Sequence, residues 1–91
     1  MPTNNTFFKD PNATLDYSVD WTEWLESDII ISVTWNVPIG IIKSSEFNTK
    51  QVATIWLSGG SIDMSYDVAC IINTAGGRTD SRIITLIVRG R

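Results

Sequence analysis

The stretch Ser65–Val88, SYDVACIINTAGGRTDSRIITLIV, decides the fold. In its first half, Tyr66 and every second residue to Ile72 fall on one face of an extended chain, and the intervening residues fall on the other. This period of two indicates a β-strand. The alternation resumes between Arg78 and Val88, after the loop Thr74–Gly77, whose glycines can adopt positive φ. The stretch therefore predicts a β-hairpin with which the other strands are expected to pair.

The chain has 91 residues, 43% of them hydrophobic, and a net charge of −3. This size fits one domain with a single apolar core. No apolar run approaches the roughly 18 residues that a membrane span needs, and the polar start of the chain does not resemble a secretion signal. Cys70 is the only cysteine, so no internal disulfide can form, and its place in a strand pattern favours a buried side chain.

The charge is unevenly distributed: residues 1–46 hold seven acids and two bases, whereas residues 47–91 hold three acids and five bases. Nucleic acid is not an expected partner, because binding to phosphates needs a clustered basic surface. The candidate cluster is short and consists of Arg78, Arg82, Arg89 and Arg91. We interpret it as a solvated edge strand whose charges discourage edge-to-edge pairing.

Residues 1–9 form a predicted N-terminal arm, and residues 10–91 form the predicted sandwich domain. The arm is polar except for the aromatic pair Phe7 and Phe8. Two interpretations of this composition are open. The arm is either a first strand placed on the sheet or a segment that orders only against a partner protein.

A short helical turn is predicted after Asp20. Asp20 and Glu23 have the spacing of a capping box, while Trp21, Trp24 and Leu25 lie at i, i+3 and i+4 on one face. A helix of at most about seven residues is not stable alone. We therefore expect the two indoles to pack on the open end of the β-core or on a neighbouring subunit.

Further alternating runs lie at residues 13–19, 29–35, 41–47 and 51–57, separated by turns that contain Gly, Pro and Asn. About seven short strands, with turn signals roughly every ten residues, predict an all-β, immunoglobulin-like antiparallel sandwich. Side chains expected in its core are Trp35, Trp56, Tyr66, Val68 and Cys70.

The sequence contains no histidine, which removes the commonest general base and every Ser-His or Cys-His nucleophile. The acids between Asp16 and Asp28 could supply a catalytic pair in principle, but capping and solvated turns account for them. No enzymatic activity, metal or cofactor is expected. Trp21 and Trp24 could instead form an aromatic sugar platform, so a carbohydrate-binding or adhesin-type module is the alternative interpretation.

Two blocks, Lys9–Tyr17 (KDPNATLDY) and Asp20–Leu25 (DWTEWL), resemble the opening motif of the fibre-tail adaptor proteins of tailed bacteriophages. Later blocks are similar to that family in order and spacing, among them ISVTW at 31–35, WLSGG at 56–60, YDVAC at 66–70 and GRTD at 77–80. The resemblance covers nearly all residues from Lys9 to Arg89. Its specificity lies in the acid-tyrosine and paired-tryptophan opening.

The resemblance implies a virion structural protein with an immunoglobulin-like fold that links tail fibres or tailspikes to the tail or neck. It implies several copies per virion and partners among the tail, neck, fibre or tailspike proteins. From charge and hydropathy, neither nucleic acid nor a membrane is an expected partner. The protein would be made in the host cytoplasm and reside in the virion. The candidate interface residues are Phe7, Phe8, Asp16, Tyr17, Trp21, Trp24, Leu25 and Arg89.

Overall fold

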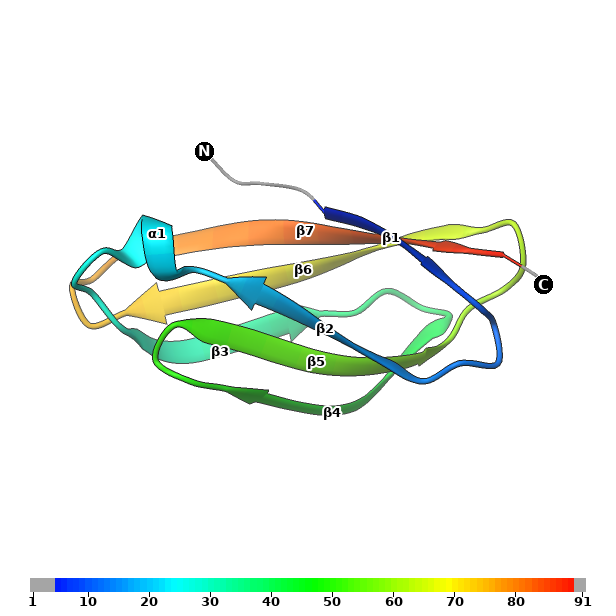
Figure 1. Ribbon diagram of the computed structural model, residues 1–91, viewed down its shortest axis with the longest axis horizontal. Helices are drawn as coiled ribbons and strands as arrows, with labels where there is room; N and C mark the ends of the chain where they lie inside the picture. Colours follow the sequence, from blue (N-terminus) through cyan, green and yellow to red (C-terminus); the bar gives the residue numbers. More distant parts are fainter. Residues whose placement is uncertain (1–4, 90–91) are drawn as a thin grey trace.

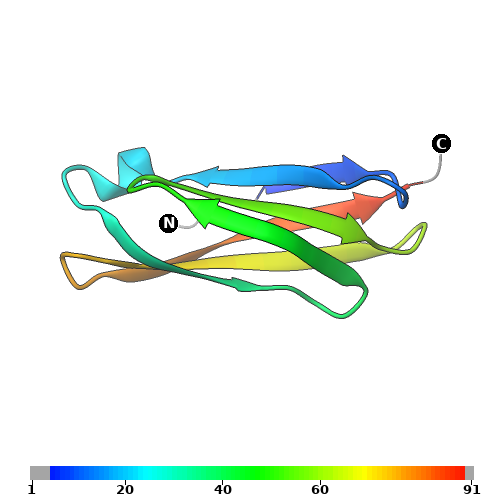
Figure 2. The ribbon, with the colours of Figure 1, turned by 90° about the horizontal axis from the view of Figure 1, so that it is seen from below.

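The computed structural model describes residues 5–89, in which seven strands form two layers (Figures 1 and 2). In chain order the elements are β1 (Asn5–Lys9), β2 (Leu15–Asp20), α1 (Thr22–Leu25), β3 (Ile30–Asn36), β4 (Ile41–Asn48), β5 (Val52–Gly59), β6 (Ser65–Thr74) and β7 (Thr79–Val88). No helix in this part of the chain is long and apolar enough to cross a membrane.

One layer is a four-stranded sheet in the order β1-β7-β6-β3, and the other is a three-stranded sheet in the order β2-β5-β4. All neighbouring strands are antiparallel except β1 and β7. The groups β3-β6-β7 and β2-β5-β4 correspond to the CFG and BED strands of an immunoglobulin domain, and β1 is the first strand, moved onto the CFG sheet. The predicted immunoglobulin-like sandwich with one short helical turn is confirmed.

The β6–β7 hairpin forms the middle of the four-stranded sheet, as the alternation predicts. Its register runs from Ser65 opposite Ile87 to Asn73 opposite Thr79. Gly77 has a φ of 84°, and its amide donates a hydrogen bond to the Thr74 carbonyl oxygen at 3.0 Å. The positive φ is why a glycine suits this turn.

Residues 5–9 of the predicted arm form β1, which pairs in parallel with β7. For these residues the first interpretation of the arm therefore holds, and they belong to the sandwich. Phe7 lies opposite Leu86, and its ring centroid is 5.2 Å from that of Tyr17 in the other layer. Phe8 points to the outer side and is 60% exposed. Residues 1–4 of the arm lie outside the described residues.

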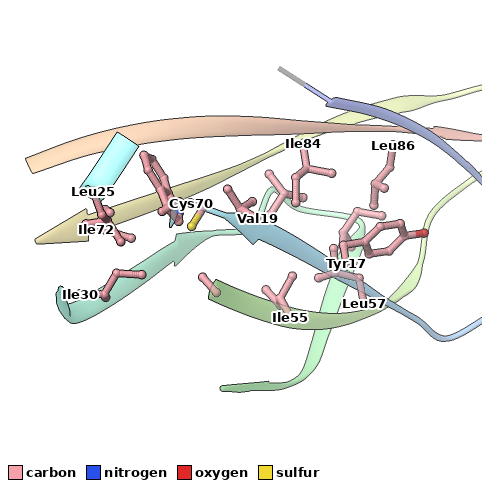
Figure 3. Packing of buried hydrophobic residues seen from close by; sticks show 14 residues of the cluster. Tyr17, Val19, Leu25, Ile30, Ile55, Leu57, Cys70, Ile72, Ile84 and Leu86 are labelled. Carbon is pink, nitrogen blue, oxygen red and sulfur yellow. The ribbon is translucent and has the colours of Figure 1, made fainter. Parts of the chain in front are cut away.

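The core fills the space between the two sheets (Figure 3). It is built from the inward residues of the central strands, all of them at most 1% exposed: Val19, Ala53, Ile55, Leu57, Val68, Cys70, Ile72, Ile84 and Leu86. Val68 and Cys70 therefore lie where the sequence predicted them. Trp21 and Leu25 close one end of the core.

Of the two tryptophans expected in the core, Trp56 lies outside it and Trp35 lies at its edge. Trp56 is 38% exposed on the outer face of the three-stranded sheet, so its predicted core position is wrong. Its neighbours Ile55 and Leu57 are fully buried, and successive strand residues point to opposite faces. Because β5 is apolar on both faces, alternation alone did not tell which face is inside. Trp35 lies opposite Cys70 on the edge strand β3 and is only half-buried against the core.

Strand β4 forms an edge of the three-stranded sheet, and Ile41 is its only buried residue. Its pairing with β5 shifts between Lys43 and Ser45. Beyond this irregularity Glu46 lies opposite the buried Ile55, on the inner side of the sheet, and it pairs with Lys43 at 2.7 Å. A bulge and inward-pointing charges are common means of keeping an edge strand from pairing with another sheet.

Candidate docking surfaces

The end of the sandwich that carries α1 is called the helix end (left in Figure 1), and it also contains the connections 26–29, 49–51 and 75–78. Trp21, which precedes α1, is completely buried, and Leu25 is 1% exposed. These two side chains plug the open end of the β-core, which was one of the two placements expected for the indoles. Their assignment to an interface is therefore wrong, because the chain's own core occupies the surface they would offer.

Arg78 and Arg82 cover the two indoles of the helix end. The Arg82 guanidinium lies 4.3 Å from the Trp21 ring centroid, and the Arg78 guanidinium lies 4.2 Å from that of Trp24. These are cation–π distances. The two rings meet edge to face, with their centroids 5.3 Å apart. The interpretation of these arginines as solvated edge charges is thus corrected, since both pack on the tryptophans.

Hydrogen bonds from the same arginines fasten α1 to β7. Arg78 donates to the carbonyl oxygens of Leu25 at 3.0 Å and Trp24 at 3.3 Å, which satisfies groups that the end of a helix leaves unpaired. Arg82 donates to the Asp20 carbonyl oxygen at 2.8 Å. A sugar platform of two indoles is not formed, because Trp21 is buried and the arginine covers a face of Trp24.

Asp28 joins the loop after α1 to the β6–β7 hairpin. The Thr74 hydroxyl, the amides of Ile29 and Gly76 and the Arg78 guanidinium hold the pKa of its carboxyl at about 2. A Cβ at Gly76 would lie 2.8 Å from the carboxylate of Asp28, so a larger residue here would displace that carboxylate. The core is therefore closed at the helix end, and a shallow pocket of about 420 Å³ remains on the surface between the loop after α1 and the β6–β7 hairpin.

The capping box predicted for α1 is not formed. The helix begins at Thr22 with Trp21 at the N-cap, so Asp20 lies one residue too early and remains in β2. The Asp20 carboxylate accepts hydrogen bonds from the hydroxyl and the amide of Thr22, and these lower its pKa. Glu23 stands in the first turn and does not cap the helix.

Cys70 lies in the core with Trp21. Burial raises the pKa of its thiol to about 11, although the Trp21 indole and the Arg82 charge act in the opposite direction. Within residues 5–89, no group of three histidine, cysteine or carboxylate side chains is placed to hold a metal ion.

The opposite end of the molecule, called the loop end, is formed by the connections 10–14, 37–40 and 60–64 (right in Figure 1). It exposes large apolar side chains at the loop tips. Ile39 is 99% exposed, Ile62 54% and Met64 53%. Exposed apolar side chains that gather in one region are characteristic of interaction sites.

Tyr66 fixes two of these loops in position. Its hydroxyl oxygen accepts a hydrogen bond from the Ser61 amide at 3.0 Å, as in the tyrosine corner of immunoglobulin domains. Its ring lies against Gly40, where a Cβ would come within 2.9 Å of it. The Gly60 amide also donates to the Gly40 carbonyl oxygen at 2.9 Å, which joins the two loops directly. Tyr66 was expected in the core and is half-buried at its edge.

Lys9 fixes the third loop. It is 2% exposed, and its Nζ donates hydrogen bonds to the carbonyl oxygens of Asp10 at 2.9 Å and Gly59 at 2.8 Å. Burial lowers the pKa of this ammonium group. The side chain thus ties the start of the β1–β2 connection to the end of β5.

A shallow groove of about 530 Å³ lies beside this third loop. Phe8, 60% exposed, and Leu15, 41% exposed, form its apolar walls, and residues of the β1–β2 connection complete it. The Arg89 guanidinium lies 4.5 Å from the centroid of the Phe8 ring. The groove therefore adds a second apolar surface to this end of the molecule.

The predicted interface residues are distributed over the whole molecule. Phe8, Asp16 and Arg89 are exposed, Phe7 and Trp24 are half-buried, and Tyr17, Trp21 and Leu25 are buried. Tyr17 is buried because it lies opposite Ile55 on the inner face of β2, so its interface assignment is also wrong. Ile39, Ile62 and Met64 were not among the predicted interface residues. Their signal was present as apolar residues inside segments with turn composition, where no core face requires them.

The fold and these surfaces define an immunoglobulin-like module with a closed helix end and an exposed apolar loop end. A family model described as podophage GP4 fiber-tail adaptor protein gp77 matches residues 9–87. The match spans nearly the whole chain, and the chain belongs to this family. No curated protein matches it. The family description indicates a phage fibre-tail adaptor, and hence a place in the virion tail, as the resemblance implied.

Proposed function

We propose that this protein physically links fibres or tailspikes to the tail or neck of the virion, in several copies, as a structural part without enzymatic activity. We further propose that it does so without contacting nucleic acid and that its loop end binds one of the two neighbours. Membership in the fibre-tail adaptor family supports the linking role. The observation that carries the contact is the group of solvent-facing apolar side chains Ile39, Ile62 and Met64.

The physical argument for the loop end combines exposure with rigidity. An isoleucine that is 99% exposed, such as Ile39, gains nothing from folding but contributes on burial in a partner pocket. Tyr66 and the Gly60–Gly40 hydrogen bond already hold the loops in place, so little ordering entropy opposes binding. Interfaces typically draw most of their affinity from a few buried side chains of this kind.

The charges at the loop end indicate the chemistry of the partner surface. Asp63 lies in a loop that carries two of the apolar tips, and Asp10 lies in the β1–β2 connection at the same end of the sandwich. Carboxylates around an apolar centre favour a partner with an apolar pocket and basic side chains at its rim, because complementary charges orient an encounter.

The test compares two exposed isoleucines on opposite ends of the sandwich. Ile39→Asp should weaken binding to the phage tail or fibre protein at least about 10-fold, since it puts a charge into an apolar contact. Ile31→Asp is the matched control, because Ile31 is 64% exposed on β3 near the helix end. Binding of the purified partners is measured by titration calorimetry. If both variants bound the partner as tightly as the wild type does, the proposed contact through the loop end would be contradicted.

A further inference from the structure

A second surface without a described occupant is the outer face of the four-stranded sheet, called the four-stranded face. The alternation of β6 and β7 places Ile71, Ile83 and Ile87 on it, because Cys70, Ile72, Ile84, Leu86 and Val88 point to the core. Phe8 of β1 lies opposite Ile87 on the same side. These side chains form an apolar strip over the centre of the sheet.

Charged side chains are rare on this face. The chain has seven basic and ten acidic residues, yet among those described, only Asp67 and Arg89 lie on it. Both already have partners: Asp67 accepts a hydrogen bond from the Thr85 hydroxyl at 2.8 Å, and Arg89 stacks on Phe8. The rest of the face is apolar, serine, threonine or asparagine. Depletion of charge is the compositional mark of an interface centre.

We propose that the four-stranded face binds the same face of a second copy of this chain. In a two-fold symmetric pair the same surface patch of both copies forms the interface. A patch that carries charge of one sign would therefore repel itself, and a self-complementary face must avoid this. On an acidic chain with a pI of about 4.6, a nearly uncharged face meets this condition. This inference goes beyond the linking function, because it needs neither the fibre nor the tail protein.

The outer face of the three-stranded sheet is less suited to self-association. It also exposes apolar side chains, namely Ile42 at 62%, Phe47 at 59% and Trp56 at 38%. Asp16 and Asp20 lie on the same side in β2, however, opposite Trp56 and Val52. Two copies paired through this face would bring carboxylates of like charge together, which weakens association.

The size of the four-stranded face is also sufficient. The strands β6 and β7 have ten residues each and are about 33 Å long, whereas β3 with seven residues is about 23 Å long and β1 with five is about 17 Å long. With neighbouring strands about 4.8 Å apart, the outline of the face is roughly 500 Å². Side chains add to this accessible area, which brings it towards the roughly 600–1,000 Å² that each partner contributes to a standard interface. Two sheets packed face to face would lie about 10 Å apart, as in a sandwich core.

The test measures the mass of the purified chain by light scattering and sedimentation at rising concentration. We expect the mass to increase from the single-copy 10.1 kDa towards twice that value. Ile83 lies at the centre of the face, opposite Ala69, and Ile83→Glu should weaken this association at least about 100-fold. Phe47→Glu, on the three-stranded sheet, is the control and should leave it unchanged. A wild-type chain that remains a single copy up to about 1 mM, or association lost only in Phe47→Glu, would overturn the proposal.

A charge-complementation experiment separates loss of contact from loss of fold. Because Ile83 lies near the expected two-fold axis, Ile83→Glu and Ile83→Lys should each be single copies, whereas an equimolar mixture should associate again. Thr34 is an exposed outer residue of β3 opposite Ile71. Thr34→Glu is therefore a second variant that places a charge on the four-stranded face without disturbing the core. Circular dichroism verifies that each variant is folded. A mixture that stays dissociated while both variants are folded would contradict a pairing of identical faces.

Discussion

Trp21 is the largest side chain that is fully buried among residues 5–89. Trp21→Ala should reduce the free energy of unfolding by about 3–5 kcal/mol, because the cavity and the lost apolar contacts both contribute. That is a large part of the roughly 5–15 kcal/mol that stabilises an ordinary domain. Urea unfolding of the variant measures the loss. Trp56→Ala, at a 38% exposed residue, is the control and should cost much less. Equal losses would show that Trp21 does not close the core.

The two tryptophans also show what a sequence pattern tells about single residues. The sequence pattern placed Trp21 and Trp24 on one face of a helical turn. It did not predict which of the two side chains is buried. That distinction comes from the buried core cluster, which includes Trp21 and leaves Trp24 at its edge. Arg78 and Arg82, which lie far away in the chain, cover the two rings. Contacts of this kind join residues more than 50 positions apart, and no local periodicity reports them.

Cys70 provides a chemical test of the core. Since burial raises the pKa of its thiol to about 11, almost none of it is thiolate at pH 8, and thiolate is the reactive form. The folded protein should therefore not react with a thiol reagent at this pH, whereas the urea-unfolded protein should react at once. Rapid labelling of the folded chain would mean that the helix end opens frequently.

At the scale of elements, Asp28 couples the loop after α1 to the β6–β7 hairpin. Its folded pKa of about 2 is below its ordinary value of 3.8, so its stabilising effect is full above pH 3.8 and is lost as the pH falls towards 2. Asp28→Asn should therefore lower the Tm clearly at pH 6, and the difference from wild type should shrink between pH 4 and pH 2. Asp16→Asn, at an exposed carboxylate of β2, is the control. A difference that is independent of pH would contradict the role of the charge.

Elements made by neighbouring residues were the ones that the sequence predicted well. The β6–β7 hairpin has an alternating pattern on both sides of a glycine loop, and it formed as expected. The parallel pairing of β1 with β7 brings together segments near the two ends of the chain. The aromatic pair Phe7 and Phe8 was compatible with this pairing but did not predict it. The predicted capping box is displaced by one residue, because β2 continues through Asp20 and the N-cap position is occupied by Trp21.

At the scale of the whole molecule, the two ends of the sandwich differ in chemistry. The helix end is closed by two indoles that meet edge to face, by the arginines that cover them and by hydrogen bonds. The loop end exposes isoleucine and methionine on a frame fixed by Tyr66 and Lys9. An elongated body with principal extents of 43 × 24 × 19 Å separates the two. Such polarity suits an adaptor that must meet a neighbour in a defined orientation.

The sequence analysis placed this contact on the aromatic opening motif, whereas the exposed apolar tips lie in the connections 37–40 and 60–64. The family motif is largely a core motif: Tyr17, Trp21 and Leu25 in it are buried. Residues that identify a family can do so because they build the fold. The proposed docking residues, by contrast, were visible in the sequence only as isolated apolar residues within turns.

Electron cryo-microscopy of the virion tail is the measurement that tests the central claim most directly. We expect the sandwich between the tail and the fibre proteins, with Ile39, Ile62 and Met64 buried against one of these neighbours. A map in which the protein sits at that position but its loop end faces solvent, with the helix end making the contact instead, would contradict the account.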